Sequence, residues 1–176
     1  MEKKYILTDD VIDFNGHTLH RIKAVRDFNC VKAGDLGGFI ESEKNLDHDG
    51  DAWVSGEAVV LDNAVVSGEA RVSGNAVVSG NAVVSGDARV SGDAVVSGEA
   101  RVREPSDIAL IKGFGSEFRA TSFFRCVDGL VRCQCGCFYG TVDEFRSKVR
   151  ETHGDSKYAK EYTMIADLME LHFKED

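Results

Sequence analysis

A six-residue repeat between Ala52 and Arg103 constrains this chain of 176 residues more than any other feature. Most units read Ala-x-Val-Ser-Gly followed by Glu, Asp or Asn, and one unit has Leu61-Asp62 in place of Ser-Gly. Within a unit, Ala and Val lie two residues apart, so on an extended segment their side chains share one side and the intervening residue points to the other. Ser-Gly then suits a bend, because glycine accepts positive φ. A period this short predicts a solenoid of short strands and bends.

The repeat also resembles a known family. The run Val54-Ser55-Gly56-Glu57-Ala58 follows the order aliphatic, small or acidic, two free positions, small, and it recurs along the segment. This order is that of the hexapeptide-repeat left-handed β-helix family, in which three units make one triangular turn. With an irregular first turn expected over residues 31–51, the resemblance implies a short left-handed parallel β-helix of about three to four turns.

If three units close a turn, the outward side chains fall onto three walls. These walls carry Trp53, Arg71 and Arg89; Val59, Val77 and Val95; and Val65, Val83 and Arg101. An all-valine wall is an apolar surface that monomers avoid exposing, so we expect the C-terminal segment or another subunit to cover it. Stacked arginines repel one another, and an anionic partner or nearby carboxylates can relieve this repulsion. The alternative is that the two arginines splay apart into solvent beside the acidic corners. The first two walls are the candidate binding face.

The flanking segments predict two caps and a mainly β fold. Residues 1–30 predict a β-hairpin that turns at Asn15-Gly16, and residues 31–104 form the β-helix. Pro105 ends the repeats, because proline cannot donate into a strand ladder. Residues 105–176 predict an α+β cap, in which a hairpin turning at Asp128-Gly129 precedes two helices.

Both helices carry sequence signals. Thr141 and Glu144 form a capping box at the start of the first, and Gly154 ends it. The second is expected from about residue 157 to 173. Its apolar stripe, which Met164, Leu168 and Leu171 widen, should pack against the valine wall or a sister chain.

Composition narrows the class of protein. Thirty acidic residues against 21 basic ones give a net charge of −9, which argues against direct nucleic-acid binding but leaves acidic mimicry of nucleic acid open. The first residues lack the apolar run of a signal peptide, and no stretch approaches membrane-spanning length. We therefore expect a cytoplasmic protein without membrane contact. Its five cysteines favour free thiols or a metal over a disulfide framework.

Three of these cysteines alternate near the second hairpin. Cys133, Cys135 and Cys137 would lie on one side of a regular strand, with neighbours about 6.8 Å apart. Zinc needs closer sulfurs, so a site would require a kink at Gly136 and His153 or Cys126 as a further ligand. The alternatives are small core residues and redox or disulfide chemistry. No other cofactor is expected.

One histidine is a candidate general base. The hexapeptide family includes acyltransferases that use a histidine between coils, and His48 is the only histidine near the repeats. The repeats lack the long looped insertion of such enzymes, and few turns leave little room for an acyl-coenzyme groove. We therefore expect no catalytic site.

A second resemblance covers nearly the whole chain. The opening residues 5–10, the segment 34–46, the repeats and the tail 135–141, Cys-Gly-Cys-Phe-Tyr-Gly-Thr, resemble phage and prophage β-helix proteins similar to the enterobacterial YdcK. With flat walls and no catalytic set, this favours a non-enzymatic phage-type protein that engages or inhibits a host defence protein in the host cytoplasm. The alternatives are a self-assembling dimer or trimer, an acyltransferase, and a sponge for a small anionic ligand on the arginine wall.

Overall fold

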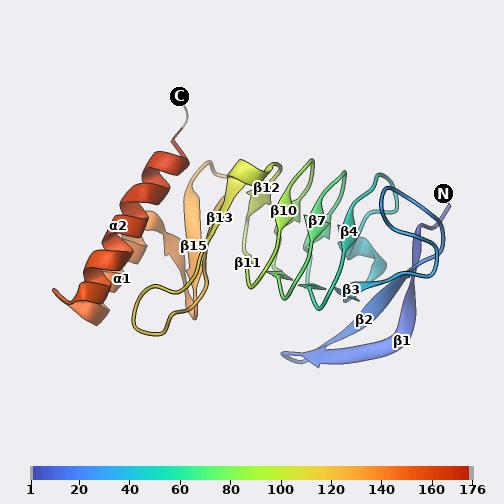
Figure 1. Cartoon of the computed structure of the whole chain (residues 1–176), viewed down its shortest axis with the longest axis horizontal. Helices are drawn as coiled ribbons and strands as arrows, with labels where there is room; N and C mark the ends of the chain where they lie inside the picture. Colours follow the sequence, from blue (N-terminus) through green and yellow to red (C-terminus); the bar gives the residue numbers. More distant parts are fainter. Residues whose placement is uncertain (1, 175–176) are drawn as a thin grey trace.

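The computed structural model describes residues 2–174 and arranges them in three parts along one long axis. An N-terminal hairpin lies at one end, a β-solenoid forms the middle, and a sheet with two helices lies at the other end (Figure 1). The fold is therefore mainly β, as predicted. None of the helices in this part of the chain is long and apolar enough to cross a bilayer.

The solenoid consists of two-residue strands that stack in parallel. They are β4 (Trp53–Val54), β5 (Val59–Val60), β6 (Val65–Val66), β7 (Arg71–Val72), β8 (Val77–Val78), β9 (Val83–Val84), β10 (Arg89–Val90), β11 (Val95–Val96) and β12 (Arg101–Val102). Each strand from β4 to β9 pairs with the strand 18 residues further on, as Val59 does with Val77 and Val77 with Val95. Eighteen residues are three units, so the predicted triangular turn and all three walls are confirmed.

The inward positions of the repeat form one continuous core. From Ala52 to Val102, every alanine and valine predicted to point inward is 1% exposed or less. Methyl-bearing side chains fill this narrow interior without leaving a polar atom to satisfy. The buried core of the solenoid is therefore formed by the alanines and valines that strand alternation predicted to point inward.

The bends stack as regularly as the strands. In the middle coils, Gly74 has φ of 71°, and a Cβ there would lie 2.9 Å from the backbone nitrogen of Gly92 in the next coil. Glycine is needed at this corner for both its conformation and the close approach. Along another corner, Asn63 donates to Asn81 (3.2 Å) and Asn81 to Glu99 (2.7 Å), which links successive coils through side chains.

The N-terminal cap is an antiparallel hairpin continuous with one solenoid wall. Strands β1 (Tyr5–Phe14) and β2 (His17–Ala24) turn at Asn15-Gly16, where both residues have positive φ. Strand β3 (Leu36–Ile40) pairs with β2 on one side and with β5 on the other, giving the sheet order β1-β2-β3-β5-β8-β11. The predicted hairpin thus extends the wall that carries the valines.

The first coil is irregular, as expected, and one asparagine supports it. The chain takes six residues from Ile40 to Leu46 and eight from Leu46 to Val54, with a 3₁₀ turn at Glu43–Asn45. The buried Asn45 amide donates to the carbonyl oxygens of Asp62 (3.1 Å) and Ala64 (2.9 Å). These bonds tie the irregular segment to the first regular coil.

One end of the valine wall is covered by the N-terminal hairpin, a segment that we had not expected there. Leu19 of the N-terminal hairpin packs with Phe39, Val59 and Leu61, and Ile12 and Phe14 lie against this cluster. Val59 is consequently 3% exposed, whereas Val77 and Val95 are half-buried. The apolar side of the hairpin lies over the wall, which the strand pattern alone does not specify.

The C-terminal cap is built on a four-stranded antiparallel sheet. After a 3₁₀ turn at Pro105–Asp107 come β13 (Ile108–Ile111), β14 (Thr121–Arg125), β15 (Val131–Cys135) and β16 (Phe138–Thr141), in that order. The predicted turn at Asp128-Gly129 joins β14 to β15. Phe124 enters the solenoid core and Phe123 the helical core, so the sheet separates two apolar layers.

Two helices complete this cap. α1 (Val142–His153) starts with the predicted capping box, in which the Thr141 N–H donates to Glu144 Oε2 over 2.8 Å, and Gly154 follows its end. α2 (Lys157–His172) packs against α1 and the sheet through Tyr162, Ile165 and Met169. Of the two alternatives for α2, packing on the valine wall was wrong, because the sheet lies between the helices and the solenoid (Figure 1), and packing on a sister chain stays a prediction.

Candidate functional site

The valine wall contributes the floor of a shallow groove. Val77 and Val95 lie between Phe14 at the hairpin tip and Gln134 of the C-terminal sheet, around a hollow of about 440 Å³. Ser97 donates to Gln134 across one end over 3.3 Å. Val59 of the predicted binding face is therefore buried, whereas Val77 and Val95 remain partly accessible to solvent.

The arginine wall differs from the expectation at its first residue. Trp53 is 5% exposed, because Tyr5 and Phe28 pack on it at ring-centroid distances of 6.4 and 5.4 Å. Arg71 is half-buried and donates to Cys30 Sγ over 3.2 Å, while Arg89 is exposed. Trp53 thus seals the N-terminal cap and is not part of an outer surface.

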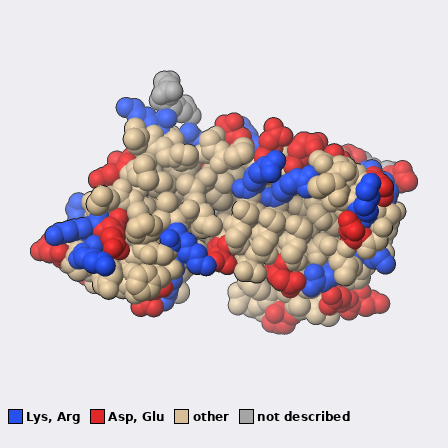
Figure 2. Space-filling model, viewed as in Figure 1, with Lys and Arg blue, Asp and Glu red and all other residues tan. Residues whose placement is uncertain are grey.

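Acidic corners flank the two arginines. Asp51, Glu69 and Asp87 occupy one corner of successive coils, two residues before Trp53, Arg71 and Arg89 in the repeat. Figure 2 shows basic side chains on the solenoid beneath a row of acidic ones. Among residues 2–174, neither Arg71 nor Arg89 forms an ion pair within 4 Å, so the corners relieve the charge through space only.

His48 lies inside the N-terminal cap. Its ring stacks on Tyr5 at 4.3 Å, its Nδ1 accepts the Lys4 N–H over 3.3 Å, and its Nε2 is 3.9 Å from Glu43 Oε2. The Lys4 side chain beside it is fully buried, and burial lowers the pKa of its ammonium to about 8. These contacts hold His48 against the first residues of the chain at the end of the solenoid.

The candidate metal ligands at the C-terminus do not converge. Cys133 is buried in the helical core, where burial raises the pKa of its thiol well above the usual range. Cys135 accepts the Thr121 hydroxyl over 3.2 Å, and Cys137 lies in a two-residue turn after Gly136, whose φ is 58°. The turn breaks the alternation that would have put three thiols on one side. His153 stacks on Tyr162 at 5.8 Å.

The most exposed large apolar side chains of α2 form a stripe that we had assigned to packing. Met164, Leu168 and Leu171 are 71%, 52% and 70% exposed, on the side of the helix opposite Tyr162 and Met169. We call these three residues the α2 stripe. In Figure 2, the region of α2 and the adjoining sheet includes a broad area with few charged side chains. The periodicity found the stripe, but it could not tell which of two apolar sides faces the core.

A network of ion pairs centred on one arginine connects α2 to α1. Arg146 of α1 contacts Asp143, Asp167 (2.7 Å) and Glu170, and only 15% of its side chain is exposed. The two acidic residues of α2 raise the pKa of Arg146 far above its usual value, so the guanidinium stays charged. The α2 stripe is therefore presented on a helix that is fixed on its other sides.

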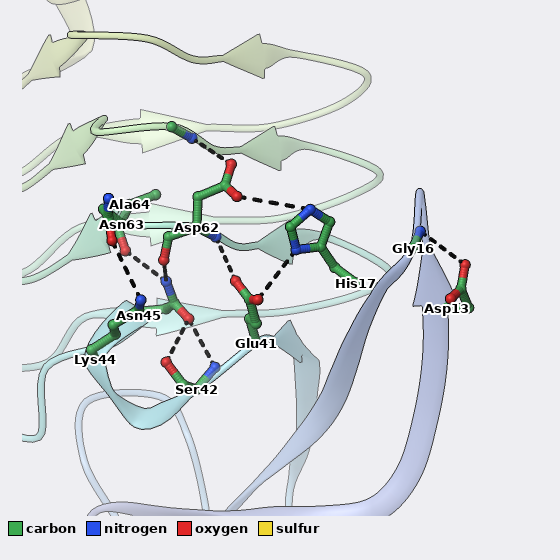
Figure 3. A network of polar contacts seen from close by, with 11 residues as sticks. Asp13, Gly16, His17, Glu41, Ser42, Lys44, Asn45, Asp62, Asn63 and Ala64 are labelled. Carbon is green, nitrogen blue, oxygen red and sulfur yellow. Dashed lines mark hydrogen bonds and ion pairs between the residues drawn. The ribbon is translucent and has the colours of Figure 1, made fainter.

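A polar cluster that sequence reasoning missed lies at the irregular corner of the repeat. His17 Nδ1 is 3.2 Å from Glu41 Oε1, and His17 Nε2 is 3.9 Å from Asp62 Oδ1 (Figure 3). Among the residues that the structure describes, these three bring potential metal-ligand atoms of His, Glu and Asp side chains within 4.8 Å of one another. The signal in the sequence was the missing Ser-Gly at Leu61-Asp62.

Comparison with known proteins supports the solenoid and goes no further. The model of the YdcK beta solenoid repeat family matches residues 70–86 and 84–98, which lie within the regular coils. No curated protein matches the chain. The chain is thus a β-solenoid repeat protein, similar to the YdcK repeat over its central coils.

Proposed function

We propose that this protein is a non-enzymatic binding protein that engages another protein through the α2 stripe. The observation that carries the proposal is that Met164, Leu168 and Leu171 are each more than half exposed on a helix whose opposite side is already packed. A helix with spare apolar positions four and three residues apart suits an apolar groove on a partner.

The size of the stripe is adequate for a binding anchor. Fully burying one exposed Leu or Met side chain contributes about 1.5–3 kcal/mol, and the part still exposed on each of these three can contribute roughly half to two thirds of that, which suits anchor residues of an interface. Lys157 and Lys160 continue the same side of the helix toward its start, and both are exposed. The partner surface that fits is an apolar groove with acidic residues at one end.

The solenoid serves this function as a rigid support. Its core is closed at both ends, by Tyr5 and Trp53 at one and Phe124 at the other. The cap that presents the stripe hydrogen-bonds to the last coil, where the Val95 N–H donates to Ser122 Oγ over 2.9 Å. In the setting implied by the YdcK-like phage proteins, the partner is a host defence protein in the bacterial cytoplasm.

Capture from a host lysate tests the proposal. Leu168→Glu/Leu171→Glu should lose a partner that the wild type retains, whereas Arg89→Glu, on the exposed arginine wall, should keep it. Both variants should melt within about 2 °C of the wild type, because exposed side chains contribute about 0.5 kcal/mol or less to stability. A partner that both variants retain would contradict the assignment of the stripe.

Self-association is the competing use of the same stripe. Two copies of α2 could pair along their apolar sides, as a self-assembling module would require. Light scattering at micromolar concentration separates the two cases. If the wild type is a dimer and Leu168→Glu/Leu171→Glu is a monomer, the α2 stripe binds a second copy of this chain and not a host protein.

A further inference from the structure

The cluster of His17, Glu41 and Asp62 joins three segments that are distant in sequence. His17 opens β2, Glu41 directly follows β3, and Asp62 lies in the corner after β5 (Figure 3). It therefore links the N-terminal hairpin to the solenoid at the mouth of the groove that Phe14 and Val77 line.

Backbone amides orient both carboxylates. One oxygen of Glu41 accepts the Asp62 N–H over 2.7 Å, and one oxygen of Asp62 accepts the Gly80 N–H over 2.9 Å. The second oxygen of each group is left facing the imidazole, at 3.2 and 3.9 Å. Hydrogen bonds that fix ligand side chains in this way are the usual support of metal ligands in proteins.

Asp62 also departs from the backbone rule of the repeat. Its φ is 58°, in the region where the equivalent corners have glycine, such as Gly56 and Gly74 at 67° and 71°. A side chain in this region costs roughly 1 kcal/mol, although Asp tolerates it better than most residues. The bend itself does not need the carboxylate, so the contacts of that carboxylate explain the departure.

We propose that His17, Glu41 and Asp62 bind one divalent transition-metal ion, with zinc as the probe, that fastens the hairpin to the solenoid. One ligand atom from each residue lies within 4.8 Å of the others. Zinc accepts imidazole nitrogen and carboxylate oxygen at about 2.0–2.2 Å, which sets neighbouring ligand atoms about 3.4 Å apart. The 3.2 Å pair, which involves Nδ1, already meets this spacing, whereas Asp62 faces Nε2 at 3.9 Å, so binding one ion requires the imidazole to turn until a single nitrogen lies near both carboxylates.

The chemistry of the donors selects the kind of ion. One nitrogen and two carboxylate oxygens suit zinc and its first-row neighbours, whereas magnesium prefers oxygen ligands alone. The three side chains are 36%, 32% and 38% exposed, so an ion can enter from solvent and water can fill the fourth position.

Zinc titration of protein treated with a chelator tests the proposal. The background variant is Cys30→Ser/Cys135→Ser/Cys137→Ser, because these accessible thiols also attract zinc. Calorimetry should show one equivalent bound, and zinc at 100 times Kd should raise Tm by about 5–10 °C, whereas magnesium should leave it unchanged. X-ray absorption should show nitrogen and oxygen ligands without sulfur.

Three variants in that background assign the ligands. His17→Gln and Asp62→Gly should lose the zinc-induced shift, and Asp62→Gly should stay folded because it restores the glycine of the other corners. His20→Gln is the matched control on β2, since His20 contacts the Thr8 carbonyl instead (3.1 Å), and it should keep the shift. No binding in the background, or binding that survives both His17→Gln and Asp62→Gly, would overturn the proposal and leave the trio as a polar clamp.

Discussion

Val78→Ala and Val77→Ala apply the same change to opposite sides of one strand. Val78 points into the solenoid and is fully buried, whereas Val77 points outward and is half-buried. Both residues pair in register with the coils above and below, and both keep a backbone hydrogen bond to a neighbouring coil: Val77 donates its N–H to Ala94, and Val78 accepts the N–H of Leu61. The comparison isolates the contribution of the core.

The magnitude follows from the methyl groups removed. Val78→Ala takes two methyl groups from a closed core, at about 0.8 kcal/mol each for transfer, and the residual cavity adds to this. We expect a loss of about 2–3 kcal/mol and a fall in Tm of about 5–10 °C for a chain of this length. Val77→Ala should cost about 1 kcal/mol or less, because water already reaches the side chain.

Urea unfolding followed by circular dichroism measures both costs. If Val78→Ala costs about 1 kcal/mol or less, or if Val77→Ala is the more costly of the two, the assignment of inside and outside is refuted, and with it the walls of the solenoid. A large cost for both would instead indicate that the valine wall is covered in solution, for example by a second copy.

The remaining predictions concern a corner, a buried lysine and a helix cap. Gly74→Ala should lower Tm more than Gly113→Ala, because both glycines have positive φ but only at Gly74 would a Cβ lie within 3.0 Å of the next coil. The pKa of Lys4 falls from 10.5 to about 8 on folding, so the unfolded state binds more protons between these values and this contribution to stability rises with pH from about 8 to 10.5. Lys4→Met should flatten that slope in urea titrations at pH 8 and 10. Thr141→Ala should cost about 1 kcal/mol by thermal melting, because it removes the acceptor for the Glu144 N–H (3.3 Å).

The regular part of the fold could be predicted because the six-residue repeat and the two-residue alternation of a strand assign the same side chains to the inside. A six-residue unit and strand alternation together place Val77 between Val59 and Val95 and send Val78 inward, as the structure shows. The turns at Asn15-Gly16 and Asp128-Gly129 and the capping box at Thr141 were equally local signals. In each case, the residues that decide the structure are near neighbours in sequence.

The parts that were missed depend on contacts between distant segments. Trp53 points outward from its strand, as the alternation requires, but Tyr5 and Phe28 cover it. His17 and Asp62 meet only because the hairpin curls back over the wall. Helical periodicity gives α2 two apolar sides, and the tertiary arrangement alone decides which of them is buried.

Site-specific photo-crosslinking from α2 tests the central functional claim most directly. A photoreactive amino acid in place of Leu168 should yield a defined adduct with one other protein in host cells, and the same group in place of Arg89 should not. Mass spectrometry of the adduct identifies the partner and the contact surface. Equal adducts from both positions, none from position 168, or an adduct with this chain alone would contradict the claim that the α2 stripe binds a partner protein.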